Sequence, residues 1–558
     1  MIKRYSVLFA TLCILISFNQ LIAGTTGKIS GKVTDSKTGD GIPSAIVTVI
    51  GTTLGAATDA NGSYVIVNVP PGTYSVSVSY IGYQPTRVNN VGVNVDYTTT
   101  LNIQLRESAV ELGEFVVEGE RNPLIRQDQT NPVVAVTSEN IQALPVTSIS
   151  QIVGLQAGVV VDDDGDIHVR GGRDNEISYT LNGISLNNPY NNESSLGVAT
   201  NALQEVSVST GTFNAEYGNA LSGVVNYVTK EGGAKFSVSI RTLTGDYYSG
   251  RKTLFPHIGD IDLFNNSRLE GTFGGPIIDE NFSFYVSGVY ERGKGYLYGE
   301  RIYSPNDFFA GRQQLNLLYT DQNGNVRKIK NPDPFGPDSI DFADPRNGNY
   351  LDPFYFNPLN KDTSDYIGRP SGDGEIVPLN TNSSYNVQGN IAFRLSSTMK
   401  LKYETVWEKG NSYRSFYNSY RYNPDGRPQD FNNSIVHALD WTHTIDNKTF
   451  YTLKVAYNRS ENKTYAFESI YDPRYLPPFY QTTLPNTTFY TGGVDLNRTV
   501  RSTETFSAKI DFVSQLFDVH EIKAGFEIRQ HTLDFESYRL EFRSVKDPSR
   551  EITFSDVY

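Results

Sequence analysis

Four aspartates within five residues form a cluster with metal-binding chemistry. They are Asp162, Asp163, Asp164 and Asp166 in the segment DDDGD. A calcium loop of the EF-hand type needs a glycine at its sixth position and a glutamate at its twelfth. Counted from Asp162, the glycine stands at the fourth position and the twelfth residue is Arg173. An Asp-Gly turn between two short strands explains the cluster better than a calcium site.

Other residue types that carry catalysis are present without the spacing that catalysis needs. Gly171-Gly172 is not followed by the Lys-Ser/Thr of a phosphate loop. The sequence has no H-E-x-x-H motif, no G-x-S-x-G nucleophile elbow and no His/Cys pair at metal-site spacing; its histidines are His168, His257, His437, His443, His520 and His531. We therefore expect no catalytic residue, no metal and no cofactor, although a Ser-His-Asp set assembled by the fold stays open.

The first 23 residues have the pattern of a secretory signal peptide. Lys3 and Arg4 form a short positive region, residues 5–18 are almost wholly apolar, and Ala23 supplies a small residue for cleavage. Cys13, the only cysteine, lies inside this segment, so the exported chain should have neither disulfide nor thiol chemistry. Loss of Lys3 and Arg4 changes the formal charge from −13 to −15, and such an acidic chain is a poor nucleic-acid binder.

Residues 24–105 are predicted to form a small β-sandwich. Short segments alternate apolar and polar positions, and turn signals such as Asn61-Gly62 separate them. In YSVSVSY, the tyrosines and valines share one face and the serines share the other, as a half-buried strand requires. The stretches GKVTD and ATDANGSYVIVNVPPGTYSVSVSYIGY resemble a carboxypeptidase regulatory-like domain. No zinc-ligand cluster accompanies them, so the resemblance implies the non-catalytic accessory module.

Residues 122–233 combine short elements with many glycines. Ser138 begins a predicted helix with Glu139 in its first turn, and SISQIVGLQAGVVV predicts a short helix followed by a strand. The motifs IHVRGG, LNGISL, E-V-x-V, Y-G and G-x-V-N-x-V-T-K then follow in this order. This series resembles the plug domain of a TonB-dependent outer-membrane receptor. Many members have Arg-Gly-Pro where this chain has Ser209-Thr210-Gly211, so no role of that arginine is carried over.

The resemblance identifies candidate site residues in the plug and in the charged linker 106–121. The plug residues are Arg170, Gly171, Gly172, Asn182, Gly183, Tyr217, Gly218, Gly223 and Asn226. In the linker, the candidate TonB box consists of Glu114, Phe115, Val116, Val117 and Glu118. Exposed β-forming residues of this kind can add a strand to the edge of a partner's sheet, and an ordinary linker is the alternative. The implied partners are a TonB-type energy-coupling protein, outer-membrane lipid and the ligand, with a surface lipoprotein as a further candidate.

Residues 234–558 repeat a period-two pattern with a charged polar face. Nine strands are predicted near 235–243, 266–274, 282–293, 384–395, 399–409, 433–445, 448–460, 502–514 and 519–532. The connections after every second strand are short and the others are long, the longest about ninety residues. Short turns at one end and long loops at the other are typical of an outer-membrane barrel. The long loops are rich in Asn, Asp, Tyr, Pro and Gly, which suits recognition of polar ligands.

The predicted fold class is mostly β: a signal peptide, a small β-sandwich, an α/β plug domain and an incomplete antiparallel transmembrane β-barrel. Barrels with a plugged lumen have about 22 strands. Nine strands could not surround a plug of this size, and their open edges would leave backbone groups unpaired in lipid. We therefore expect the N-terminal part of a longer protein, or a truncated gene product.

The resemblance implies active import of a nutrient ligand across the outer membrane of a Gram-negative bacterium, with the plug gating the lumen. The front domain and plug would be periplasmic or luminal, and the long loops extracellular. The family carries siderophores, cobalamin, glycans and peptides, and the front sandwich favours glycans or peptides. A surface adhesin, or another outer-membrane binding protein without transport, is the alternative.

Overall fold

The computed structural model describes most of the chain after residue 25. The described residues are 26–108, 115–118, 133–144, 146–162, 165–213, 217–251, 255, 258, 261–279, 281–307, 316–320, 326–330, 371–413, 416–476, 481, 488–516, 520–542 and 552–556. Glu114, Asp163 and Asp164 lie outside them, as does the predicted signal peptide. Within the described ranges, no helix is long and apolar enough to cross a membrane.

The front domain is a sandwich of two small sheets, as predicted. One sheet has the order β4-β1-β7, with β8 also paired to β1, and contains β1 (Gly27–Asp35), β4 (Ser63–Val69), β7 (Thr98–Thr100) and β8 (Ile103–Leu105). The other has the order β3-β2-β5-β6-β9 and contains β2 (Ile46–Val49), β3 (Gly55–Ala57), β5 (Gly72–Ser79), β6 (Thr86–Val93) and β9 (Phe115–Glu118). Alternate apolar side chains such as Ile29, Val47 and Val76 are fully buried in the core between the sheets.

The plug is built on a five-stranded sheet with the order β10-β15-β16-β13-β14. Its strands are β10 (Val133–Thr137), β13 (Ile177–Leu181), β14 (Ile184–Ser185), β15 (Leu203–Thr210) and β16 (Gly223–Thr229). Strands β13 and β16 are parallel and the other neighbours are antiparallel. Strands β15 and β16 are buried along almost their whole length, so the plug has its own core.

Two short helices and a hairpin complete the plug. Helix α2 (Ser138–Ala143) begins at the predicted residue, and α3 (Ile149–Gly154) begins with a capping box in which Ser148 accepts a hydrogen bond from the Gln151 amide. Strands β11 (Val159–Val161) and β12 (Ile167–Val169) pair as an antiparallel hairpin. The turn prediction for the DDDGD segment is therefore confirmed. Among the described residues, no group of three or more His, Cys, Asp and Glu side chains is arranged to hold a metal ion.

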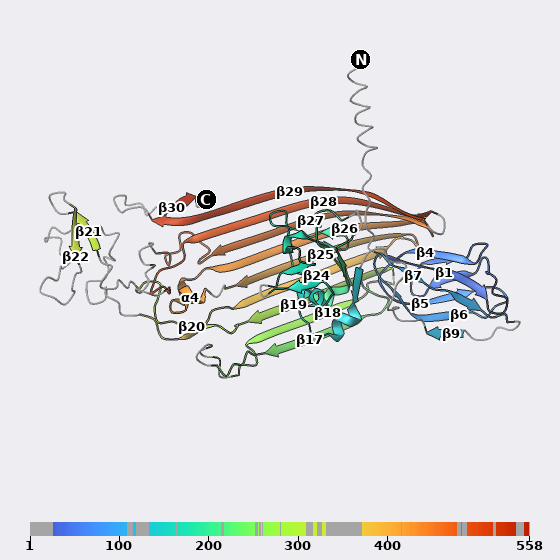
Figure 1. Cartoon of the computed structure of the whole chain (residues 1–558), viewed down its shortest axis with the longest axis horizontal. Helices are drawn as coiled ribbons and strands as arrows, with labels where there is room; N and C mark the ends of the chain where they lie inside the picture. Colours follow the sequence, from blue (N-terminus) through green and yellow to red (C-terminus); the bar gives the residue numbers. More distant parts are fainter. Residues whose placement is uncertain are drawn as a thin grey trace, which may run out of the picture.

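Ten antiparallel strands form one curved sheet, which we call the wall (Figure 1). In order they are β17 (Ser237–Gly245), β18 (Asn266–Pro276), β19 (Phe282–Gly293), β24 (Asn382–Arg394), β25 (Met399–Ser412), β26 (Gln429–Asp446), β27 (Thr449–Tyr465), β28 (Asn497–Leu516), β29 (His520–Phe542) and β30 (Ile552–Asp556). The end strands β17 and β30 are not paired with each other in the described part of the chain, so the sheet is not closed.

The wall buries polar side chains and exposes apolar ones, the reverse of a sheet in a soluble protein. In β24, Gln388 and Asn390 are 1 % and 3 % exposed, whereas Ile391 and Phe393 are 44 % and 43 % exposed. In β28, Ser507 and Lys509 are buried while Phe506 and Ile510 are exposed. The buried polar face lies against the plug. This inversion is what a barrel with lipid outside and a plug inside requires.

All nine predicted wall strands are present, but several extend beyond their predicted ends and a tenth strand was not predicted. Strands β28 and β29 are longer than the predicted 502–514 and 519–532, and β30 is a tenth strand. Backbone pairing continues into polar stretches such as residues 497–501, where the side chains no longer alternate in hydropathy. Periodicity detects only the part of a strand that has one apolar face.

The front domain, the plug and the wall lie against one another (Figure 1). The hairpins β18–β19, β24–β25, β26–β27 and β28–β29 have connections of no more than five residues, and all of these lie at one end of the wall, the short-turn end. The front domain lies at this end, and the plug lies on the polar face of the wall. The long-loop end carries β20 (Tyr298–Glu300), β21 (Asn316–Thr320), β22 (Val326–Lys330), β23 (Ile376–Pro378) and α4 (Tyr417–Tyr420).

Candidate functional site

The turn between β13 and β14 is where the plug contacts the charged face of the wall. Asn182 and Gly183 have φ of +48° and +78°, a left-handed conformation that favours these two residue types. The turn points both carbonyl oxygens at the wall. Lys454 Nζ donates to the Asn182 oxygen, and Lys509 Nζ donates to the Gly183 oxygen at 3.3 Å. The backbone oxygens of two residues in the sequence motif LNGISL therefore accept hydrogen bonds directly from lysines of the wall.

The Asn182 side chain connects the turn to both the plug and the wall. Its Nδ2 donates to Thr229 Oγ1 at 2.9 Å and to Glu404 Oε2 at 2.5 Å, and its Oδ1 accepts the Thr229 amide at 3.2 Å. Asn182 is 5 % exposed. An unpaired polar group at this depth would cost about 1–3 kcal/mol, so these contacts fix the position of the turn.

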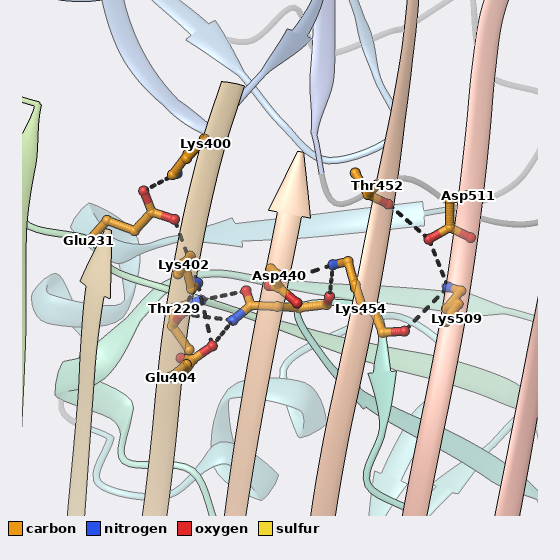
Figure 2. A network of polar contacts seen from close by, with 12 residues as sticks. Thr229, Glu231, Lys400, Lys402, Glu404, Asp440, Thr452, Lys454, Lys509 and Asp511 are labelled. Atoms are coloured by element: carbon orange, nitrogen blue, oxygen red, sulfur yellow. Dashed lines mark hydrogen bonds and ion pairs between the residues drawn. The ribbon is translucent and has the colours of Figure 1, made fainter. Parts of the chain in front are cut away.

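Charges of opposite sign alternate across the wall beneath this turn (Figure 2). Lys402 Nζ lies 3.4 Å from Glu404, Lys454 Nζ lies 3.9 Å from Asp440 and Lys509 Nζ lies 3.5 Å from Asp511. All six side chains are nearly buried once the plug is in place. Buried charges need partners, and here both wall carboxylates and plug carbonyls supply them.

Glu231 adds a carboxylate from the plug to this network (Figure 2). It follows β16 and lies 2.5 Å from Lys400 Nζ and 3.5 Å from Lys402 Nζ. Burial raises the pKa of Glu231, but the charges of Lys400 and Lys402 outweigh this effect and lower the pKa to about 2. Glu231 is therefore a carboxylate at all ordinary pH values and ties the end of the plug to β25.

A second group of contacts holds the plug nearer to the long-loop end. The Gly197 amide donates to Glu408 Oε2 at 2.6 Å, and Asn386 Nδ2 donates to the Gly197 oxygen at 2.6 Å. Ser434 Oγ donates to the Ser195 oxygen at 2.8 Å, and Asn458 Nδ2 donates to Ser195 Oγ at 2.7 Å. The plug is thus bound to several wall strands through polar groups.

The arginine-glycine motif after β12 allows two segments of the plug to approach closely. Arg170 and Gly171 have φ of +50° and +77°, which turns the chain sharply. A Cβ at Gly172 would lie only 2.4 Å from the Ser222 Cβ, and a Cβ at Gly211 only 2.4 Å from Arg170 Nη1. Gly211 thus leaves room for the Arg170 side chain.

The remaining predicted plug residues have different surroundings. Thr180 Oγ1 donates to Asn226 Oδ1 at 2.7 Å within the plug core, and a Cβ at Gly223 would lie 3.1 Å from Val169. Tyr217 lies near the front domain, with its hydroxyl 3.5 Å from Asp96 Oδ2. An added Cβ at Gly218 would meet no atom within 4 Å. The structure therefore places Asn182 and Gly183 against the wall, Asn226 in the plug core and the arginine-glycine motif elsewhere in the plug.

Residues Phe115–Glu118 of the candidate TonB box form β9, the edge strand of the front domain, and Glu114 lies outside the described residues. It pairs in parallel with β6, from Thr86 opposite Phe115 to Asn89 opposite Glu118. Val116 and Val117 are 52 % and 38 % exposed. The sequence predicted that this segment could add a strand to the edge of a partner's sheet, whereas in the structure it pairs with β6 of the chain's own front domain, which nothing in the pattern of β6 indicated.

The charged wall residues were not predicted individually. Lys402, Glu404 and Lys454 lie at polar positions of predicted strands. The only sequence feature that pointed to them was the unusual charge of the polar face of these strands. Which charges meet depends on the register of neighbouring strands, such as Lys402 opposite Asp440 and Lys454 opposite Lys509. That register is not visible in a single strand.

Two family models match the chain, and curated relatives match part of it. A carboxypeptidase regulatory-like domain matches residues 28–106, and a TonB-dependent receptor plug domain matches residues 126–224. The TonB-dependent transporter Oar of Myxococcus xanthus is 25% identical over 321 residues, which are 54% of this chain and 29% of that protein. The TonB-dependent receptor SusC of Bacteroides thetaiotaomicron is 29% identical over 231 residues, 37% of this chain and 21% of SusC. The chain thus spans less than a third of either relative.

Solved structures resemble the chain at low sequence identity. The outer membrane transporter YddB from Escherichia coli is 12% identical with a TM-score of 0.46, covering 74% of this chain and 50% of YddB. The ferric citrate transporter FecA is 10% identical with a TM-score of 0.44, covering 77% of this chain and 51% of FecA. The chain therefore contains a carboxypeptidase regulatory-like domain and a TonB-dependent receptor plug domain, and over part of its length it is similar to TonB-dependent transporters and receptors.

Proposed function

We propose that the receptor imports a nutrient ligand across the outer membrane of a Gram-negative bacterium, and that movement of the plug opens the path. The observation that carries this proposal is how the plug is held. Hydrogen bonds and ion pairs surround three small apolar contacts with the wall, at Val406 and Val436, at Ala438 and Ala456, and at Val289. Polar contacts can be exchanged for contacts with water at a small net cost, whereas an extensive apolar seal would cost about 25 cal/mol for each Å² exposed. Such a plug is removable.

In this proposal the short-turn end faces the periplasm and the long-loop end faces outward. The segment Phe115–Glu118 is then on the side where a TonB-type energy-coupling protein acts. Its exposed valines and strand conformation suit recognition by β-strand pairing. The cycle involves ligand binding, a pull on this segment and plug movement, and it involves no bond chemistry.

The long-loop end offers side chains that suit a ligand with both apolar and polar faces. The Arg421 guanidinium lies 4.8 Å from the Tyr422 ring centre and 5.2 Å from that of Phe489. Stacked aromatic and arginine groups with polar neighbours favour a glycan or a peptide as the ligand.

The import proposal is tested by the depletion of solutes from the growth medium. Cells carrying the full-length receptor are compared with cells carrying the variant Val116→Pro/Val117→Pro, which lacks two strand amides. The control Val116→Thr/Val117→Thr keeps β-forming residues with their amides. We expect the proline variant and a strain without the coupling protein to leave the same solutes in the medium, and the threonine control to consume them.

Surface display must be equal in all strains, measured by antibody labelling of whole cells. If the proline variant depletes the medium as the wild type does, coupling through this segment is refuted. If adhesion to a surface, and no solute, depends on the receptor, the adhesin alternative replaces import.

A further inference from the structure

The loop between β6 and β7 joins the front domain to the plug. The Val95 amide donates to Glu205 Oε1 at 3.2 Å, and Glu205 is 1 % exposed. Tyr97 Oη donates to the Val133 oxygen at 2.5 Å. Glu205 is the first residue of the E-V-x-V motif, and the plug–wall network gives it no role. Its buried carboxylate instead accepts a hydrogen bond from the front domain, at the end of the plug sheet.

The same domain is also attached to the wall by charged groups. Lys523 Nζ of β29 lies 3.0 Å from Asp96 Oδ1, and Lys28 Nζ of β1 lies 2.7 Å from Glu521 Oε2. Lys28 also donates to Gln515 Oε1 at 3.1 Å. The side chains in these two ion pairs are only 15–25 % exposed. Asp96 contacts the wall through Lys523 and the plug through Tyr217, so a single loop reaches both.

An apolar contact supports these ion pairs. In β4, Tyr64 and Ile66 face the sandwich core, so Val67 should be exposed on the opposite face. Val67 is instead 4 % exposed because it packs against Phe450 and Val513 of the wall. Next to it, Asn68 Nδ2 donates to Thr444 Oγ1 at 3.2 Å. The front domain is therefore docked by an apolar centre with polar contacts around it.

We propose that the front domain is a clamp that ties the plug to the short-turn end of the wall, so that the plug leaves the wall only after the domain undocks. All the contacts on which this proposal rests join residues of this chain that the structure describes. Because β9 is a strand of the clamp, a pull on Phe115–Glu118 acts on the clamp before it acts on the plug. Only this last step rests on the proposed coupling role.

The clamp is tested by cysteine labelling in outer-membrane fractions of cells that carry the full-length receptor. Cys13, the only cysteine in this sequence, lies in the predicted signal peptide, and each reporter is introduced singly into a receptor in which any other cysteine is replaced by serine. Val513→Cys reports docking, because this position is 4 % exposed beneath the front domain. Ala199→Cys reports plug retention, because this position is 5 % exposed between the plug and Val289 of the wall. Maleimide labelling is followed over a urea titration.

Lys28→Glu places a negative charge beside Glu521 and should release the domain. We expect about tenfold faster labelling at position 513, and labelling at position 199 at a lower urea concentration. Adding Glu521→Lys should restore both, which a merely misfolded variant could not do. The matched control Lys32→Glu reverses an exposed charge on the same strand and should change neither.

Unchanged labelling at position 513 in Lys28→Glu would overturn the docked arrangement. Faster labelling at position 513 with an unchanged urea midpoint at position 199 would show a docked domain that does not clamp the plug, and would also overturn the proposal. Neither readout uses a coupling protein. Failure of import would therefore leave the clamp intact, and failure of the clamp would leave import intact.

Discussion

Glu231 is the residue at which pH should affect plug docking most simply. The pKa of its carboxyl is raised by burial but lowered further by Lys400 and Lys402, to about 2 from the usual 4.5. Because the docked pKa is below the free value, the carboxylate stabilises docking above pH 4.5, and this contribution is lost as the pH falls from 4.5 towards 2. We predict that Glu231→Gln weakens docking by about 1–2 kcal/mol at pH 7.

The measurement is the urea midpoint for labelling of Ala199→Cys, with and without Glu231→Gln. The difference between the two midpoints should shrink as the pH falls below 4.5, and this comparison cancels the effects of other carboxyl groups. Equal midpoints at pH 7, or a difference that grows in acid, would contradict the assigned role of Glu231.

His168 provides a second test at the scale of one residue. Its Nε2 lies 3.2 Å from Asp162 Oδ2 and its Nδ1 lies 3.0 Å from the Gly172 oxygen. The hydrogen bond with Asp162, followed by that with Gly172, raises the pKa of His168 above 6.5, since a protonated ring donates from both nitrogens. This pairing stabilises the β11–β12 hairpin below pH 6.5 and is lost as the pH rises through the raised pKa.

We predict that Asp162→Asn lowers the pKa of His168, measured by NMR titration of the histidine ring. The variant Asp59→Asn, in the front domain, should leave it unchanged. A His168 pKa that is at or below 6.5 in the parent, or that does not respond to Asp162→Asn, would rule out this pairing.

The conformation of single residues could be predicted where a short sequence motif alone determines it. Asn182-Gly183 is a turn by its own chemistry, and the structure has it as a left-handed turn. The contacts of Asn182 with Glu404 and of Glu231 with Lys400 join residues far apart in sequence. No local pattern contains such pairs, so the plug–wall network could be located only from the assembled fold.

At the scale of elements, two glycines of the plug motif make a matched pair. A Cβ at Gly172 would overlap Ser222 at 2.4 Å, whereas a Cβ at Gly218 would meet nothing within 4 Å. We predict that Gly172→Ala destabilises the plug by about 1–3 kcal/mol because β12 and the segment before β16 must move apart. Gly218→Ala should change stability by no more than about 0.5 kcal/mol.

Both alanine variants can be measured by urea denaturation, with labelling of a buried cysteine such as Val153→Cys as the signal. The control matters because both glycines were identified by the same sequence resemblance. If the two variants are equally stable, or if Gly218→Ala is the less stable one, close packing is not the reason for Gly172.

The wall strands were predictable because each has one apolar and one polar face. Residues 282–293 were predicted as a strand and form β19 with those bounds. Strand β9 has four residues, and its pairing with β6 was invisible because parallel partners are distant in sequence. The orientation of the faces could be predicted only together with the fold class, since alternation alone does not say which face is buried.

At the scale of the whole molecule, the front domain, plug and wall form one connected body. The wall contributes an inverted sheet, the plug fills its polar face, and the front domain contacts both at the short-turn end. This arrangement is stable only if the outward apolar face of the wall contacts lipid. An exposed face bearing Ile391, Phe393 and Phe506 in water would instead promote aggregation.

The most direct test of this account is a spin-label scan of β24 in the outer membrane, with single cysteines at each position from 386 to 393. Oxygen, which concentrates in lipid, should reach the labels at 387, 391 and 393 and should be excluded at 388, 390 and 392, where the plug and neighbouring wall residues cover the strand. A water-soluble nickel reagent should reach none of the outward positions. If that reagent instead reaches 387, 391 and 393 freely, the apolar face of the wall is in water and the account of a lipid-embedded, plugged receptor is wrong.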